Sequence, residues 1–343
     1  MGNWESIANE VIATGGLNAL DVVRRRKIAD VVAITNRSLI IYAVDSPVSN
    51  PIKGQIGDIS ISLTDKDGFD EVTRNLPGPN LDVVLHTPGG SAEATESVVE
   101  LLRARFDDIR FIVPNMAKSA GTIMAMAGNQ ILMDERSELG PTDPQMLFYS
   151  GQQARPSPAQ AIKDQFEQAQ QDINGDPARL PGWVPILQAY GPSLLAECDN
   201  HIELAKELVR TWLEKYMFAG DADGSTKSRI IADYLADHKN FLSHGRRLGM
   251  GKLIDLGVNI LNMNTQPALR DAVWDLYLAT SITFLNSGAY KSFENSNNEA
   301  LIRQIQMQFE GNVNQPQSLP TPPQTPINPL ASRPPRSERK RGK

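Results

Sequence analysis

The chain alternates short apolar runs with longer amphipathic stretches over most of its length. Three runs have the composition of buried strands, because they are short, continuous and rich in β-branched residues: 38–44 (SLIIYAV), 81–85 (LDVVL) and 111–113 (FIV). Helical spacing of apolar positions follows the second and third runs, over 93–105 and 120–130. Strands that alternate with helices predict a parallel sheet with right-handed crossovers, so the expected fold class is α/β.

The same pattern extends in both directions along the chain. The other predicted elements are helices at 4–33 and 67–75, a strand or its turn at 55–63 (QIGDISISL), a short strand at 131–133, and helices at 157–217, 227–237 and 268–310. Pro and Gly residues interrupt the stretch 157–217 near 176–185, which favours a helical insertion or arm. The basic run 24–27 (RRRK) is typical of a solvated helix face, with a contact to a partner or a lipid headgroup as the alternative.

Composition divides the chain into four segments. We expect an N-terminal helical segment at 1–34, a main α/β domain at 35–260, C-terminal helices at 261–310 and a tail at 311–343. The tail is rich in Pro and Gln, and its last eleven residues hold six Lys or Arg and one Glu. Such a segment cannot bury a core, so we expect it to be disordered. It is either a solubilising extension or a basic contact for nucleic acid or an acidic partner.

Overall composition excludes several classes of protein. The chain has 343 residues, 41% of them hydrophobic and 22% charged, as is usual for a globular protein. Its net charge of −6 argues against nucleic acid as the main ligand of the folded part. No eighteen-residue apolar stretch and no signal-peptide pattern are found, so we expect a cytoplasmic protein without a transmembrane segment. The single Cys198, expected to be buried, suits a reducing compartment. Neither zinc-ligand nor phosphate-loop spacing occurs, so no metal or cofactor is expected.

Candidate chemistry lies in two turns about thirty residues apart, 86–91 (HTPGGS) and 117–122 (AKSAGT). Each turn follows a predicted strand of the parallel sheet, so both turns are expected at the same sheet edge. Small residues surround Ser119 and permit a tight strand-to-helix turn, at which backbone N–H groups can hold an oxyanion. Ser119 is therefore the candidate nucleophile, and a simple helix cap is its alternative role.

These segments resemble the Clp-protease/crotonase superfamily. Within it, the chain is most similar to signal-peptide-peptidase-like serine proteases, in particular the serine dehydrogenase proteinase (SDH) group. The resemblance covers roughly 35–260 through HTPGGSAEA, VPNMAKSAGTIMAMAGNQILMDERSELGPTDPQ and SHGRRLGMGKLIDLGV. It implies a Clp/crotonase-like superhelix of strand–turn–helix units, a homo-oligomer, and an extended peptide or unfolded protein segment as substrate. It also implies that the amides of Gly90 and Ala120 form the oxyanion hole, with Gly89 allowing the necessary backbone turn.

A general base is harder to assign from the sequence. Clp peptidases carry a histidine in the turn that corresponds to 140–144, and here that turn (GPTDP) contains none. Signal-peptide-peptidase relatives use a Ser/Lys dyad instead, with the lysine some tens of residues after the serine. Lys163 fits this placement, 44 residues after Ser119, and is the predicted base. This role requires burial that lowers its pKa, and a surface lysine on an amphipathic helix is the alternative.

Four further residues lie close to these motifs in sequence. His86 is given a structural or substrate-side role, and Lys118 a contact with the substrate or a neighbouring subunit. Asp143, between two prolines, is expected to hold its loop, with support of catalysis as the alternative. His244, in SHGRRLG, is assigned to a loop or an interface.

The resulting prediction is a serine endopeptidase with a Ser119/Lys163 dyad. A crotonase-type acyl-CoA enzyme is the first alternative, since it uses the same oxyanion architecture, although a serine at the nucleophile position argues against it. The second alternative is a scaffold or adaptor that keeps the fold without a working dyad.

Overall fold

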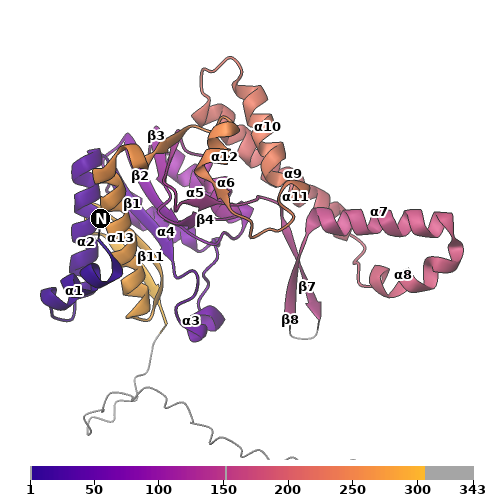
Figure 1. Cartoon of the computed structure of the whole chain (residues 1–343), viewed down its shortest axis with the longest axis horizontal. Coiled ribbons are helices and arrows are strands. Elements are labelled where there is room, and N and C mark those ends of the chain that lie inside the picture. The colour runs from indigo at the N-terminus through magenta and orange to yellow at the C-terminus, as the bar shows by residue number, and fades with distance from the viewer. Residues whose placement is uncertain (1, 151–152, 306–343) are drawn as a thin grey trace, which may run out of the picture. The chain divides into compact units, whose positions relative to one another are not determined.

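A seven-stranded sheet forms the centre of the computed structural model, which describes residues 2–150 and 153–305 (Figure 1). The strand order is β10-β5-β3-β2-β1-β11-β12. The five strands from β10 to β1 pair in parallel, whereas β11 and β12 are antiparallel. Their bounds are β1 (Ser38–Val44), β2 (Asn80–His86), β3 (Asp108–Ile112), β5 (Gln130–Met133), β10 (Ile260–Asn262), β11 (Ala289–Asn295) and β12 (Ala300–Gln304).

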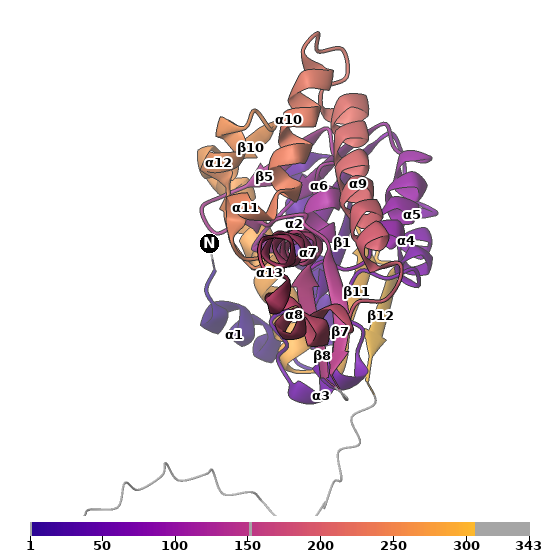
Figure 2. The ribbon, with the colours of Figure 1, turned by 90° about the vertical axis from the view of Figure 1, so that its right-hand side faces the viewer.

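Helices cover both faces of this sheet (Figure 2). The α-helices of the described residues are α1 (Trp4–Thr14), α2 (Ala19–Thr35), α3 (Pro51–Ile56), α4 (Asp65–Thr73), α5 (Ala92–Arg103), α6 (Ala120–Ala125), α7 (Ala159–Gly175), α8 (Leu180–Leu187), α9 (Leu194–Trp212), α10 (Gly224–Ala236), α11 (His238–Phe241), α12 (Met250–Asp255) and α13 (Pro267–Leu285). Of these, α7 and α8 lie in the arm that extends away from the sheet (Figure 1). Three short non-α turns are η1 (Pro177–Arg179), η2 (Leu213–Met217) and η3 (Met263–Thr265).

Strand β1 shows how the sheet divides the core into two layers. Its even-numbered residues, such as Ile40 and Tyr42, pack with α4, α5, α6 and α9 in one buried cluster. Its odd-numbered residues, such as Leu39 and Ile41, pack with α2 and α13 in another. Successive side chains of a strand point to opposite faces, so a fully apolar run is what a sheet covered on both sides requires. The central sheet and its two helical layers confirm the α/β class predicted from the sequence.

A second, three-stranded sheet determines where the candidate site forms. Its strands are β4 (Met116–Ala117), β6 (Glu138–Leu139) and β9 (Leu248–Gly249), in the order β4-β6-β9. Ala117 pairs with Leu139, and Leu139 pairs with Leu248. Three loops that are far apart in sequence therefore leave this sheet side by side.

Several elements differ from the sequence predictions. Residues 4–33 form two helices instead of one, and α6 ends at Ala125, well short of residue 130. Residues 55–63 contain the end of α3 and a single bridge from Ile61 to Gly90 instead of a strand. The arm contains a hairpin, β7 (Gln145–Ser150) and β8 (Gln153–Pro158), before its helices. Residues 289–304, expected to be helical, form β11 and β12.

The burial of Arg24 and Cys198 tests two other predictions made from the sequence. Arg24 is buried against Glu294 of β11 and is not part of a solvated face. Cys198 is buried, as predicted. The tail 311–343 lies outside the described residues. No helix among the described residues is both long and apolar enough to cross a membrane.

A buried ion pair supports the segment next to the Gly90 turn. The Lys291 ammonium of β11 lies 2.8 Å from Asp65 Oδ1 and donates to the carbonyl of Ser60 at 2.7 Å. The Tyr42 hydroxyl donates to the other carboxylate oxygen of Asp65 at 2.8 Å. Both charged side chains are fully buried. Because Ser60 precedes Ile61, this network fixes the segment that pairs with Gly90.

Replacing Lys291 with methionine leaves the Asp65 carboxylate buried without its main counter-charge. We expect Lys291→Met to lower the free energy of unfolding by about 3–5 kcal/mol, measured by urea denaturation followed through tryptophan fluorescence. The exposed Lys66→Met on α4 is the matched control and should change it by less than about 1 kcal/mol. Equal effects of the two substitutions would contradict a stabilising role for this pair.

Candidate active site

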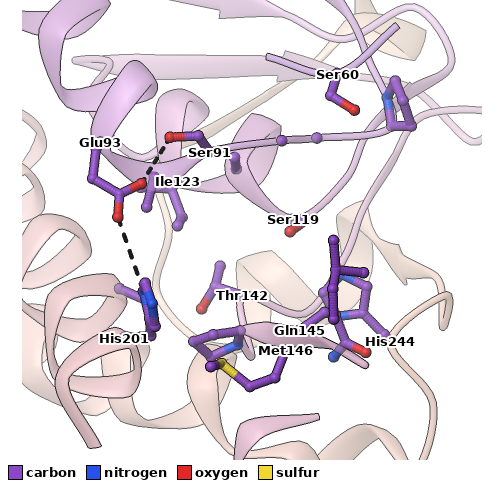
Figure 3. A pocket seen from close by; sticks show the side chains of 18 residues that line it. Ser60, Ser91, Glu93, Ser119, Ile123, Thr142, Gln145, Met146, His201 and His244 are labelled. Carbon is purple, nitrogen blue, oxygen red and sulfur yellow. Dashed lines mark hydrogen bonds and ion pairs between the residues drawn. The ribbon is translucent and has the colours of Figure 1, made fainter. Parts of the chain in front are cut away.

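A cleft of about 580 Å³ opens between the two candidate turns (Figure 3). Ser119 and Ala120 come from the start of α6, Gly89 and Gly90 from the turn after β2, and His244 from the loop before β9. The other lining residues are Ser60, Pro88, Ser91, Ala92, Glu93, Ile123, Thr142, Pro144, Gln145, Met146, Leu147, His201 and Ala205. The structure therefore brings both sequence motifs to one cleft at the carboxyl edge of β2, as expected for parallel strands.

Ser119 lies on a strained turn between β4 and α6. Its backbone has φ 50° and ψ −118°, a conformation that a residue with a side chain rarely adopts. Its side chain makes no capping hydrogen bond to α6, although Ser119 occupies the N-cap position. A helix cap is thus not the role that the geometry supports. The sharp turn instead presents the hydroxyl to the cleft, where Figure 3 shows it facing the open space.

The double glycine forms the opposite wall because no larger residue fits there. A Cβ at Gly89, where φ is 108°, would lie 2.7 Å from both Ser119 Cβ and the Lys118 carbonyl oxygen. A Cβ at Gly90 would lie 2.3 Å from the backbone N and O of Ile61. The turn can therefore approach the serine closely only without side chains.

Backbone hydrogen bonding leaves two amides at the cleft. The Gly89 N–H donates to Thr87 Oγ1, and its carbonyl accepts from Ile61. Within the described part of the chain, the N–H groups of Gly90 and Ala120 have no hydrogen-bond acceptor. The Ala120 N–H belongs to the first turn of α6, where amides have no carbonyl acceptor within the helix. Two unpaired donors on either side of Ser119 have the arrangement that an oxyanion requires.

Asp143 joins two imidazoles behind the cleft. Its carboxylate is buried, with Oδ1 lying 2.7 Å from His244 Nδ1 and Oδ2 lying 3.2 Å from His238 Nδ1. A carboxylate only accepts hydrogen bonds, so the His244 Nδ1 carries the proton and Nε2 is left as the basic nitrogen. Only His244 of these two histidines lines the cleft with Ser119.

The three-stranded sheet explains how these residues meet. Ser119 lies two residues after β4, Asp143 lies four residues after β6, and His244 lies four residues before β9. Since β4, β6 and β9 are neighbours, the nucleophile, the carboxylate and the imidazole converge at one end of this sheet. A serine, an imidazole and a buried carboxylate make the set of groups used in nucleophilic acyl transfer.

Part of the chain, including Ser119 and Asp143, matches a known protein family. Residues 60–176 match the family model of the ClpP-like SDH-type serine proteinases. This stretch resembles the SDH-type serine proteinases. The match confirms the resemblance and the Clp-like fold predicted from the sequence, and we refer to residues 60–176 as the SDH-like region.

Two curated relatives are uncharacterized proteins of Methanocaldococcus jannaschii. MJ0137 is 36% identical over 104 residues, which are 30% of this chain and 35% of the relative. MJ1495 is 25% identical over 181 residues, which are 52% of this chain and 51% of the relative. The chain thus spans about a third and about a half of the length of these two relatives.

Solved structures of one protease also align with the chain. A mutant of the 1510-N membrane-bound stomatin-specific protease covers 61% of this chain and 79% of its own, with 14% identity and a TM-score of 0.36. A second mutant of it, in complex with a substrate peptide, covers 59% and 70%, with 15% identity and a TM-score of 0.35.

Lys163, the predicted base, lies in the SDH-like region but not at the cleft. It is on α7, where its ammonium forms an ion pair with Asp199 of α9. The hydrogen bond to this carboxylate raises the pKa of Lys163, opposite to what a general base requires. Lys163 is not among the residues that line the cleft with Ser119. The position and the ion pair of Lys163 therefore do not favour it as a general base.

Lys118 and His86 also lie away from the reacting groups. The Lys118 ammonium contacts Glu138 Oε1 at 3.0 Å and the Leu139 carbonyl at 3.1 Å, so it links β4 to β6 instead of facing a substrate. His86 is buried at the end of β2, with Nε2 2.8 Å from the Ser46 carbonyl oxygen. Burial lowers the pKa of His86 to about 4, so it is neutral at physiological pH. Both residues support the backbone around the site.

His244, assigned from the sequence to a loop or an interface, lies in a loop that lines the cleft and was not predicted as a candidate base. It lies 101 residues after Asp143 and outside the SDH-like region. Clp peptidases carry their histidine in the turn that corresponds to 140–144, which contains none here. The sequence does contain an indication that His244 lies near the site, because the segment SHGRRLGMGKLIDLGV is one of those that carry the family resemblance.

Proposed function

We propose that this protein hydrolyses peptide bonds as a serine peptidase, with Ser119 as nucleophile, His244 as general base and Asp143 as the group that orients His244. The observation that carries this proposal is the convergence of Ser119, His244 and two free amides on one cleft, with Asp143 bonded to His244. The match of the SDH-like region to a family of serine proteinases supports the same reaction.

The reaction follows from the positions of these groups. The Ser119 hydroxyl oxygen attacks the carbonyl carbon of the peptide and gives its proton to His244 Nε2. The carbonyl π electrons move to the oxygen, and the Gly90 and Ala120 amides stabilise the resulting anion. The tetrahedral intermediate collapses, the C–N bond breaks, and the imidazolium protonates the leaving amine. Water, activated by the same imidazole, then hydrolyses the acyl-enzyme and restores the Ser119 hydroxyl.

Substrate binding completes this arrangement. Within the described residues, no hydrogen bond joins the Ser119 hydroxyl to the His244 imidazole, although both line the cleft. Catalytic hydrogen bonds are often long in a free enzyme and shorten once a substrate fills the site. The mechanism therefore requires the Ser119 hydroxyl and the His244 imidazole to come within hydrogen-bond distance when a substrate binds, while Asp143 keeps the imidazole in the correct tautomer.

We further propose that the enzyme is a cytoplasmic homo-oligomer that cleaves extended peptide segments. The β7 residues Gln145, Met146 and Leu147 line one wall of the cleft and support this proposal, because an extended peptide can lie along a strand. The single buried Cys198 suits a reducing compartment.

The two alternatives differ in what they require of Ser119. An acyl-CoA enzyme needs the amide pair but no activated serine, and a scaffold needs neither. The strained backbone of Ser119 and the His244–Asp143 hydrogen bond favour the peptidase, because a scaffold has no use for either.

A fluorophosphonate probe tests the proposal directly. We expect the probe to label the wild-type protein at Ser119, and Ser119→Ala to abolish labelling and reduce peptide hydrolysis by about 10⁴–10⁶-fold. Ser97→Ala, on α5 and away from the cleft lining, is the matched control and should label as wild type does. Unchanged hydrolysis by Ser119→Ala would overturn the proposal, whereas tight binding of CoA thioesters without labelling would favour the acyl-CoA enzyme.

A further inference from the structure

The charged side chain in the cleft lining is acidic. Of the side chains that line it, Glu93 is the only carboxylate, and neither lysine nor arginine is present among the described lining residues. Other polar lining groups are hydroxyls, one amide and two imidazoles. A cleft with this lining attracts positive charge and has no cation with which to hold an acidic side chain.

Glu93 is held in place within the first turn of α5. Its Oε2 accepts a hydrogen bond from Ser91 Oγ at 2.7 Å, and its Oε1 lies 3.9 Å from His201 Nδ1. The hydrogen bond from Ser91 lowers the pKa of Glu93, followed by its own backbone amide, so the side chain is ionised at neutral pH. About half of the side chain remains exposed. Glu93 thus offers a fixed negative charge with an oxygen still open to a ligand.

A second group in the cleft lacks a partner. The Thr142 hydroxyl is buried and has no hydrogen-bond partner among the described residues. Figure 3 shows it between Ser119 and His201, on the side of the serine that leads towards Glu93. A buried hydroxyl without a partner is costly, and a hydrogen-bonding group of a substrate removes that cost.

The position of His244 decides which part of a substrate reaches this end of the cleft. His244 must protonate the leaving amine, so the amine half of the peptide lies on its side of Ser119. Glu93 and His201 lie on the opposite side of Ser119 from His244 (Figure 3). This end therefore receives the acyl half of the substrate. Glu93 is three residues from Gly90, within about 10 Å along the backbone, which a long side chain can bridge.

We propose that this end of the cleft is a specificity pocket for a lysine or arginine side chain on the substrate residue that supplies the scissile carbonyl (P1), with Glu93 pairing its charge and the Thr142 hydroxyl accepting a hydrogen bond from it. Ile123, one helical turn after Ser119, contacts the aliphatic part of the side chain, and Ala205 on α9 leaves room for it. This inference rests on the proposed peptidase function and names the substrates of that site.

Three peptides that differ only at P1 test the pocket: arginine, its neutral analogue citrulline, and norleucine. We expect wild-type kcat/KM to be about tenfold higher for arginine than for citrulline, because the two differ in charge and hardly in shape. Glu93→Gln should bring this ratio close to one. Glu93→Lys should make the arginine-to-citrulline ratio fall below one, and it should favour a P1 glutamate over a P1 glutamine. A purely structural role for Glu93 predicts neither change.

The Thr142→Val substitution tests the contribution of the Thr142 hydrogen bond to substrate preference separately from that of the Glu93 charge. It should lower the citrulline-to-norleucine ratio of kcat/KM by about threefold and leave the arginine-to-citrulline ratio unchanged. Glu100→Gln, an exposed position on the same helix α5, is the matched control and should change neither ratio. An arginine-to-citrulline ratio of one in the wild type, or one that survives Glu93→Gln, would overturn the pocket.

Failure of this inference differs from failure of the proposed function. If fluorophosphonate labels Ser119 and all three peptides are cleaved equally, the peptidase stands and the pocket is refuted. If no peptide is cleaved and Ser119 is not labelled, both are refuted. Equilibrium binding of the arginine and citrulline peptides to Ser119→Ala gives the same charge ratio without turnover, and an equal affinity for the two would also count against the pocket.

Discussion

Replacing His244 with alanine is expected to lower kcat for peptide hydrolysis by about 10⁴-fold or more. Without the His244 imidazole, the Ser119 hydroxyl has no oriented acceptor for its proton and the leaving amine has no donor, because His201 lies at the other end of the cleft. The amides of Gly90 and Ala120 remain, so a small residual rate above that of the uncatalysed reaction should persist. Steady-state hydrolysis of a fluorogenic peptide measures the loss.

His238 provides a matched control for this substitution. Both imidazoles contact the same carboxylate of Asp143, but only His244 lines the cleft. We expect His238→Ala to lower kcat by no more than about tenfold, through looser positioning of Asp143. Lys163→Ala should leave kcat within about twofold, since it removes only an exposed ion pair of the arm. A large loss in Lys163→Ala together with a small loss in His244→Ala would restore the Ser/Lys dyad.

The central strands and both candidate turns were predictable because their signals are local. Strand β1 is apolar throughout, as a sheet covered on both faces requires, and the run at 81–85 is likewise buried. The turn at Gly90 comes four residues after β2, and Ser119 comes seven residues after β3, beyond the short β4. Because β2 and β3 pair in parallel, both turns are expected at the same edge of the sheet. The fold class and the proposed nucleophile can therefore both be predicted from short segments of the sequence taken in order.

The proposed general base, His244, could not be predicted in the same way because its position depends on pairing between strands that are far apart in sequence. His244 meets Asp143 only because β9 joins β6 in a strand pairing of two residues each. Strands of two residues are too short to produce a recognisable hydrophobic pattern in a sequence. For Lys163 the local sequence is ambiguous, because a lysine with apolar neighbours on a helix is compatible either with a buried base or with a surface ion pair. The partner that decides, Asp199, lies on another helix.

Strands β11 and β12 were missed for a related reason. Strand β11 (AYKSFEN) buries Lys291 and Glu294, which look like exposed positions in a sequence. Their partners, Asp65 and Arg24, come from α4 and α2, more than 200 residues earlier. Buried charge is acceptable there only because these partners are present, so the burial of this strand cannot be recognised until the fold is known.

Gly90→Ala is expected to lower kcat by about 10²–10³-fold. A Cβ at this position would lie 2.3 Å from the backbone N and O of Ile61, and Lys291 fixes the adjacent Ser60 carbonyl from behind. Ile61 therefore has little freedom to retreat, and the glycine turn must move instead. Its N–H then leaves the position from which it can stabilise the oxyanion.

Activity per labelled site and stability must be measured separately for this variant. Fluorophosphonate titration counts the sites in which Ser119 still reacts, and urea denaturation reports how far the strained turn destabilises the fold. The matched control is Gly182→Ala on α8, where a Cβ would meet nothing within 4 Å, so both quantities should stay close to wild type. If Gly90→Ala is well folded and retains full kcat per site, the Gly90 amide does not stabilise the oxyanion, and Ala120 must do so with another donor.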